Sequence, residues 1–200
     1  MIKIIIIGAL IAMLIFSIVR KLNLFGSWST TQRLSSPSEI IEISAPLSIY
    51  KSAVKKTLIT VGIGILILLI TIILASKFKI ALIMLPVSFY LIGQFFILNN
   101  HLKASKNQNM IYNSITHEVQ VEKKNNKLQI FNLLNDVKMV SEIKSVQKNN
   151  GLLFGYYVLH TKKENYYIPY IIAQNPQTKP FFDKLQLFDR EIETKLFPII

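Results

Sequence analysis

The chain of 200 residues contains no cysteine, a single tryptophan and only 11 acidic residues against 23 basic ones. The absence of cysteine excludes disulfides, thiolate metal sites and cysteine nucleophiles, and it fits a reducing compartment without requiring one. Charged residues make up only 17% of the chain, whereas hydrophobic residues make up 51%. This balance argues against an ordinary soluble globular protein.

Enzyme signatures are also missing from the sequence. His101, His117 and His160 are isolated, and none has a second histidine or a carboxylate at metal-ligand spacing. We expect His101 to lie at a membrane interface, and His117 and His160 to have structural roles in strands. Gly62 and Gly64 lie within an apolar run, which excludes a nucleotide-binding loop. The sequence therefore predicts no catalytic residue, no cofactor and no metal.

Long apolar runs are the clearest positive feature. Residues 57–98 carry no charge except Lys77 and Lys79, and residues 1–19 carry none except Lys3. An apolar helix of about 20 residues spans the roughly 30 Å of bilayer hydrocarbon. We predict three transmembrane helices: one at 1–20, retained as a signal anchor, and a hairpin at 57–99. A cleaved signal peptide is the alternative at 1–20, but no small-residue cleavage site follows.

Polar and proline residues within the hairpin lead to two further predictions. Pro86 removes a backbone donor and bends the second helix, and Ser88 or a neighbouring helix satisfies the freed carbonyl. Gln94 forms a hydrogen bond between helices.

The segment 21–56 reads as a polar cytoplasmic loop. Ser36-Pro37-Ser38-Glu39 is typical of a helix start, yet the β-branched residues 40–43 favour a short strand equally. From Pro46 onward, one helical face carries Leu47, Tyr50, Ala53 and Val54. We expect an interfacial helix that runs into the next span, with its lysines at the level of the lipid phosphates.

Basic residues set the predicted orientation. Six lie between the first two spans, whereas the hairpin turn holds only two; the six are Arg20, Lys21, Arg33, Lys51, Lys55 and Lys56. Because basic loops stay cytoplasmic, we expect a multi-pass protein of the cell inner membrane with its C-terminal domain in the cytoplasm. The net charge of +12 is concentrated beside the spans, which argues against nucleic acid as a partner.

Residues 100–200 predict a cytoplasmic β domain. Alternating or β-rich stretches occur at 115–122, 127–132, 136–140, 142–146, 153–161 and 166–172, and polar turns separate several of them. In the first stretch, Ile115, His117, Val119 and Val121 would share one face. Closely spaced strands without intervening helices favour an antiparallel sandwich or partly open barrel. The spacing of the apolar residues then changes from alternation to a helical period. We therefore expect an amphipathic helix at about 177–196 that closes the sheet.

This pattern resembles the bacterial pleckstrin-homology-like (PH-like) domains of the YcxB-like type. The resemblance covers about residues 40–190, and its most specific part is a strand pair, 155–159 and 166–169, ending in Ile168-Pro169 before Phe181-Phe182-Asp183-Lys184-Leu185. Residues 142–146 resemble the family's acidic-Ile-x-x-Val element, although Val140 and Ser141 replace its usual tryptophan. The extra first span is a further departure. The resemblance implies a membrane-tethered binding module without catalytic residues.

Lysine-rich turns are the candidate binding site. Lys123, Lys124 and Lys127 form one cluster, and Lys162 and Lys163 form another. Turns at one end of a sheet meet in space, so these lysines could contact anionic lipid or a protein partner. Ordinary solvated lysines that keep sheet edges soluble are the alternative, and it is favoured.

Tyrosines form a second cluster, comprising Tyr156, Tyr157, Tyr166, Tyr167 and Tyr170. Alternation sends about half of them into the core, and the others could form a protein-binding face.

These features predict a fold of membrane helices plus an α+β domain, and a non-enzymatic protein that binds a protein partner or anionic lipid within a membrane assembly. Oligomers are possible. An immunity-type protein that neutralises a toxin at the membrane is one alternative. An accessory subunit of a transporter or channel is another, although the spans carry few polar residues.

Overall fold

A computed structural model describes residues 40–123, 128–149 and 151–200. The predicted first span at 1–20 and most of the predicted loop at 21–56 lie outside these residues. Within the described part, two helices are long and apolar enough to cross a membrane by length and composition, Leu47–Ala75 and Lys79–Lys106. The structure thus supports two candidate spans rather than the three predicted.

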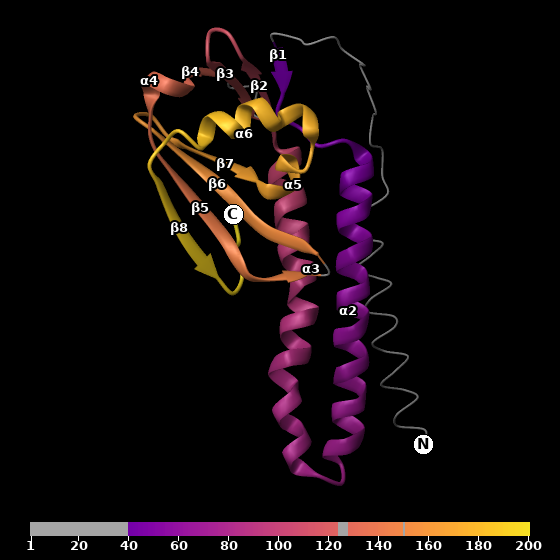
Figure 1. The fold of residues 1–200 in the computed structure, drawn as a ribbon. Coiled ribbons are helices and arrows are strands. Elements are labelled where there is room, and N and C mark those ends of the chain that lie inside the picture. The colour runs from indigo at the N-terminus through magenta and orange to yellow at the C-terminus, as the bar shows by residue number, and fades with distance from the viewer. Residues whose placement is uncertain (1–39, 124–127, 150) are drawn as a thin grey trace.

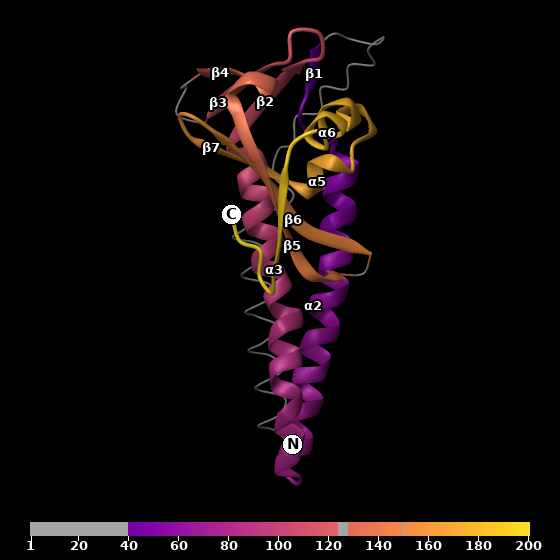
Figure 2. The ribbon, with the colours of Figure 1, turned by 60° about the vertical axis from the view of Figure 1, so that its left-hand side comes forward.

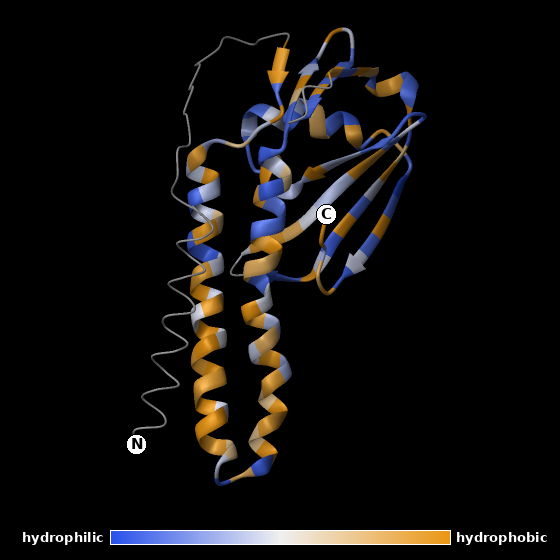
Figure 3. Ribbon diagram, turned by 180° about the vertical axis from the view of Figure 1, so that it is seen from behind, coloured by the Kyte–Doolittle hydropathy of each residue, from blue (hydrophilic) through white to orange (hydrophobic). Residues whose placement is uncertain are grey.

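The two helices form an antiparallel hairpin (Figure 1). Helix α2 (Leu47–Ala75) begins directly after Pro46, as the sequence predicts. It runs without interruption, so its first turns continue into the candidate span, as the sequence predicts. Their position at a membrane interface stays a prediction. The short 3₁₀ helix η1 (Lys79–Met84) leads into α3 (Leu85–Lys106). Figure 3 shows that apolar residues cover the part of both helices nearest the turn.

Two polar predictions within the hairpin have different outcomes. Pro86 stands in the first turn of α3, where its missing donor costs little, so the irregularity falls in η1 instead of within the helix. The Ser88 hydroxyl donates to the Leu85 carbonyl at 2.9 Å. The prediction for Gln94 is wrong: its amide donates to the Tyr90 carbonyl of the same helix at 3.4 Å.

Four strands form the first sheet, in the order β1-β2-β3-β4 and antiparallel throughout. They are β1 (Ile40–Glu42), β2 (Gln108–Asn113), β3 (Glu118–Lys123) and β4 (Leu128–Asn132). Of the two readings open at residues 36–43, the strand at 40–42 is therefore confirmed. Strand β2 was not predicted. His117 lies in a turn with a positive φ of 58°, so β3 begins later than expected and Ile115 is exposed.

The second sheet has the order β7-β6-β5-β8. After the short helix α4 (Leu133–Asp136) come β5 (Val137–Asn149), β6 (Leu152–Thr161) and β7 (Asn165–Pro169), which pair antiparallel. Strand β5 joins the two stretches predicted at 136–140 and 142–146. The predicted stretch at 166–172 ends early, because the chain turns into α5 (Tyr170–Ala173) after Pro169.

The predicted C-terminal helix at 177–196 is wrong beyond its first third. The chain forms η2 (Pro176–Thr178) and α6 (Lys179–Leu185), and then β8 (Arg190–Lys195), which pairs parallel with β5. Leu187, Ile192 and Leu196, expected on a buried stripe, are 72%, 54% and 53% exposed. Pairing with the second edge of β5 satisfies backbone groups that a helix would have left unpaired.

One hydrophobic core joins the helices to both sheets. It includes Tyr50 and Val54 of α2, Leu98 and Leu102 of α3, and residues from most of the strands and from α6. In Figures 1 and 2 the sheets and short helices lie beside and above the upper ends of α2 and α3, while the turn between these helices projects away. The described chain is therefore a mixed fold in which a helical hairpin and an antiparallel sheet domain share their packing.

Candidate functional site

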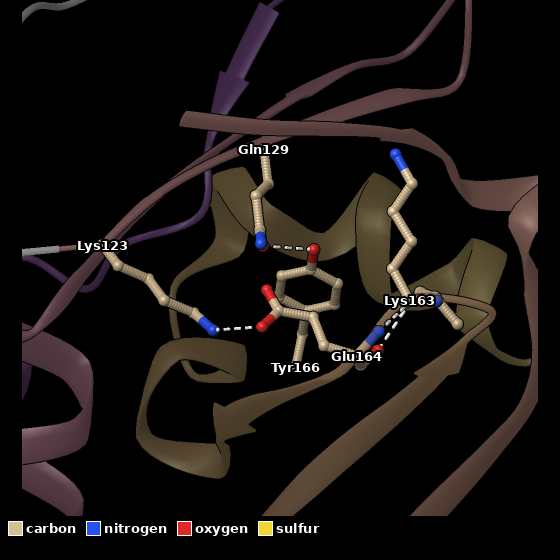
Figure 4. A network of polar contacts seen from close by, with 6 residues as sticks. Lys123, Gln129, Lys163, Glu164 and Tyr166 are labelled. Atoms are coloured by element: carbon tan, nitrogen blue, oxygen red, sulfur yellow. Dashed lines mark hydrogen bonds and ion pairs between the residues drawn. The ribbon is translucent and has the colours of Figure 1, made fainter. Parts of the chain in front are cut away.

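The structure brings two of the predicted lysine turns together. Lys123, at the end of β3, forms an ion pair of 2.8 Å with Glu164, in the turn between β6 and β7 (Figure 4). Strand β3 belongs to the first sheet and β7 to the second, so this pair links the two sheets. Lys124 and Lys127 lie outside the described residues.

A buried tyrosine supports this ion pair. The Tyr166 hydroxyl donates to Gln129 Oε1 at 2.6 Å, and its ring lies 5.5 Å from Lys123 Nζ and stacks on Phe131. Burial first, and the Glu164 carboxylate second, raise the pKa of the Tyr166 hydroxyl. Together these contacts fix the position of the β6–β7 turn relative to β3 and β4 (Figure 4).

Lys162 and Lys163 differ from Lys123 in their surroundings. Both are exposed, and neither forms an ion pair within the described part of the chain. Thr161 shapes their turn, because its hydroxyl donates to the Glu164 carbonyl at 2.7 Å and accepts from the Lys163 amide. The turn thus presents two cationic side chains to solvent, while Lys123 is neutralised by its partner.

The position of this turn bears on what it can contact. Both views of the ribbon place the β6–β7 turn in the half of the domain that points away from the hairpin tip (Figures 1 and 2). The β5–β6 turn lies elsewhere, beside α2: a Cβ on Gly151 would stand 3.9 Å from Lys56 Nζ, and Lys148 is exposed nearby in sequence. The sequence gives no sign that Lys56 approaches Gly151, because the two residues lie far apart in the chain.

The three histidines lie apart from one another in structural roles. His101 is buried against Phe154 and Tyr156, and His117 accepts or donates a 2.8 Å hydrogen bond with the Tyr112 hydroxyl. His160 Nε2 lies 2.7 Å from Ser141 Oγ across β5 and β6. A serine–histidine pair could activate a hydroxyl nucleophile, but no third group orients this histidine among the described residues. The same residues contain no cluster of three metal-ligating side chains.

The tyrosine cluster serves mainly for packing. Tyr156 and Tyr166 are buried, Tyr157 and Tyr170 are half-buried, and Tyr167 is exposed. The Tyr170 hydroxyl donates to Glu142, which also pairs with Arg190 of β8 at 3.5 Å. Burial first, and the bonded Glu142 carboxylate second, raise the pKa of Tyr170. This set therefore connects α5, β5 and β8.

Residues 196–200 form a further contact that the sequence did not indicate. His101 Nε2 donates to the Pro198 carbonyl at 2.8 Å, and the Asn100 side chain exchanges two hydrogen bonds with the backbone of Ile200. The Tyr156 hydroxyl donates to the Ile199 carbonyl at 3.1 Å. Partners one hundred residues apart give no local signal.

Comparison of the chain with protein-family models, curated proteins and solved structures found no match. The site is therefore interpreted from its own geometry.

Proposed function

We propose that this protein is a non-enzymatic integral membrane protein whose hairpin anchors a cytoplasmic PH-like domain, and that the domain binds a protein partner through the β6–β7 turn. The YcxB-like resemblance, two largely antiparallel sheets and a short helix, α6, are consistent with the PH-like part of this proposal.

The core shared by helices and sheets is the observation that carries the proposal. Tyr50 and Ala53 of α2 and Ile97 and Leu98 of α3 are buried among domain residues. A domain on a flexible tether would sample many orientations, whereas this packing fixes the domain relative to the anchor. The anchor thus determines which surface faces the cytoplasm.

Charge placement supports the orientation. Lys51, Lys55 and Lys56 lie on the domain side of the hairpin, and only Lys77 and Lys79 lie at its tip. The positive-inside rule then places the domain in the cytoplasm. The lysines near the domain would neighbour anionic headgroups, at about 1 kcal/mol each.

The exposed pair Lys162 and Lys163 points to a partner in solution or on another membrane protein. In this orientation the β6–β7 turn lies in the half of the domain away from the bilayer (Figure 1). Lipid contact by the same molecule falls instead to Lys56 and Lys148. An acidic partner surface would complement the turn, and association would weaken with salt.

Site-specific photocrosslinking tests the proposal. A photoreactive residue at Lys163 in native membranes should give an adduct of one defined mass, while the same residue at the exposed Ile115 should not. Changing Lys162 to Gln in the Lys163-labelled protein should reduce the adduct several-fold. Equal adducts at both positions, or none at Lys163, would contradict partner binding at this turn.

A further inference from the structure

We infer that the apolar segment at residues 196–200 dips into the lipid layer beside α3 at Leu196 and Phe197. This inference rests on the proposed function, because it requires the hairpin to cross a bilayer. It adds a lipid contact made by a segment of the sheet domain rather than by a span.

The register of the two helices sets the depth scale. A Cβ on Gly64 would stand 2.8 Å from Leu91 Cβ and 3.1 Å from the Ser88 carbonyl oxygen. Gly64 of α2 is therefore level with residues 88–92 of α3, and the helices run antiparallel from there.

Phe197 lies deeper than the lysines that mark the domain side. At about 1.5 Å per residue, Lys56 is about 12 Å from the Gly64 level toward the domain, whereas Gly93 is only about 4 Å from it. A Cβ on Gly93 would stand 2.9 Å from the Phe197 ring, and that ring lies 5.6 Å from the Tyr90 ring. Phe197 is therefore about 8 Å nearer the hairpin tip than Lys56.

The length of the hairpin leaves no room for this segment outside the bilayer. Residues 57–76 span about 30 Å, which equals the hydrocarbon thickness. If the hydrocarbon began only on the tip side of Phe197, about 22 Å of α2 would be left to cross it. That length is shorter than the hydrocarbon is thick. The hairpin spans the hydrocarbon only if Phe197 lies within it.

The side chains of the segment suit this position. Leu196, Phe197 and Ile199 are 53%, 39% and 56% exposed. Phe89 and Phe96 of α3, which share a helical face with Gly93, are likewise 59% and 63% exposed. The charged residues Glu193 and Lys195, paired at 3.1 Å, precede the segment directly, as expected where a chain passes from headgroups to hydrocarbon.

Most of the backbone carbonyls of the segment are paired with protein donors although it forms no helix or strand. The carbonyls of Pro198, Ile199 and Ile200 accept from His101, Tyr156 and Asn100, and the Phe197 carbonyl accepts from the Ile199 amide. Irregular backbone at membrane depth requires such internal partners, because the hydrocarbon offers none. Exposed side chains over a paired backbone are what a lipid-facing segment needs.

Single-cysteine spin labels test the inference, and the natural chain lacks cysteine, so each substitution gives one site. Leu196→Cys and Phe197→Cys are labelled in the full chain in vesicles of zwitterionic and anionic phospholipid. Collision rates with oxygen, which concentrates in hydrocarbon, and with a polar nickel chelate are compared. Phe89→Cys is the lipid control, and Leu128→Cys of β4, 60% exposed, is the matched domain control.

The expected oxygen-to-nickel ratio at residues 196 and 197 is several-fold above that at residue 128 and close to that at residue 89. A ratio at both positions equal to that at residue 128, with residue 89 in lipid, would overturn this inference alone. If residue 89 also behaved as water-exposed, the hairpin would not lie in the bilayer, and the proposed function would fail with it.

Discussion

His101 and Pro198 are joined by a hydrogen bond of 2.8 Å that connects α3 to a segment 97 positions later. The imidazole is buried, at 2% exposure, so its donor has no access to water. The same region holds the bonds of Asn100 to Ile200 and of Tyr156 to Ile199. The end of the described chain is thus fixed to the base of the domain.

Replacing His101 by Leu should release residues 196–200. The Pro198 carbonyl would lose its donor in a buried site, which costs about 1–3 kcal/mol of unfolding free energy. Denaturant unfolding in detergent measures the loss, and hydrogen exchange at the Ile199 and Ile200 amides should accelerate.

The variant His101→Gln, which keeps a donor, should recover part of the stability. His117→Leu, at the other end of the domain, should leave exchange at residues 199 and 200 unchanged. If His101→Leu left that exchange as slow as in the natural protein, the hydrogen bond would not hold the segment.

The close approach of α2 and α3 at Gly64 predicts a steric effect. Changing Gly64 to Ala places a methyl group 2.8 Å from Leu91 Cβ and 3.1 Å from the backbone of Ser88 and Ile92. Overpacking of this kind should cost about 1–3 kcal/mol of hairpin stability, measured by denaturant titration in micelles.

Gly62 provides the matched control, two residues earlier in the same helix. A Cβ there would meet nothing within 4 Å, so Gly62→Ala should be neutral or slightly stabilising. Equal losses in both variants would show that α2 and α3 do not pack at Gly64.

Alkaline pH should destabilise the domain. Burial and neighbouring carboxylates raise the pKa values of Tyr166 and Tyr170, so the folded state favours their protonated forms. Their contribution is complete below about pH 10, the pKa of an unfolded tyrosine, and is lost as the pH rises above it.

The double variant Tyr166→Phe, Tyr170→Phe should be less stable at neutral pH, by about 1 kcal/mol per lost hydrogen bond. Its stability should also fall less steeply above pH 10, as followed by near-ultraviolet circular dichroism. Tyr167→Phe, at an exposed position, should keep the natural slope. An unchanged slope in the double variant would contradict the assigned role of these hydroxyls.

The sequence predicted the features that depend on local pattern. The run at 57–98, uncharged apart from Lys77 and Lys79, was enough to predict the hairpin and its turn. The start of α2 after Pro46, and strands β3 to β7, also followed from proline position and alternation.

The features that it missed depend on contacts between distant residues. The segment around strand β8 has apolar residues at helical spacing, Leu185, Phe188, Ile192 and Leu196, and pairing with the free edge of β5 makes residues 190–195 a strand. The Lys123–Glu164 pair joins positions 41 residues apart, so sequence reasoning grouped Lys123 with the other candidate binding lysines. The approach of Lys56 to Gly151, and the fixing of residues 196–200 on α3, have no local signal either.

Topology labelling tests the central claim, a membrane hairpin with its domain in the cytoplasm, most directly. Ser76→Cys, at the exposed hairpin turn, and Lys163→Cys, in the β6–β7 turn, are each treated with a membrane-impermeant maleimide on intact cells and after lysis. We expect labelling of residue 76 in intact cells, and of residue 163 only after lysis. Labelling of residue 163 in intact cells, or release of the chain from membranes by alkaline carbonate, would contradict the account.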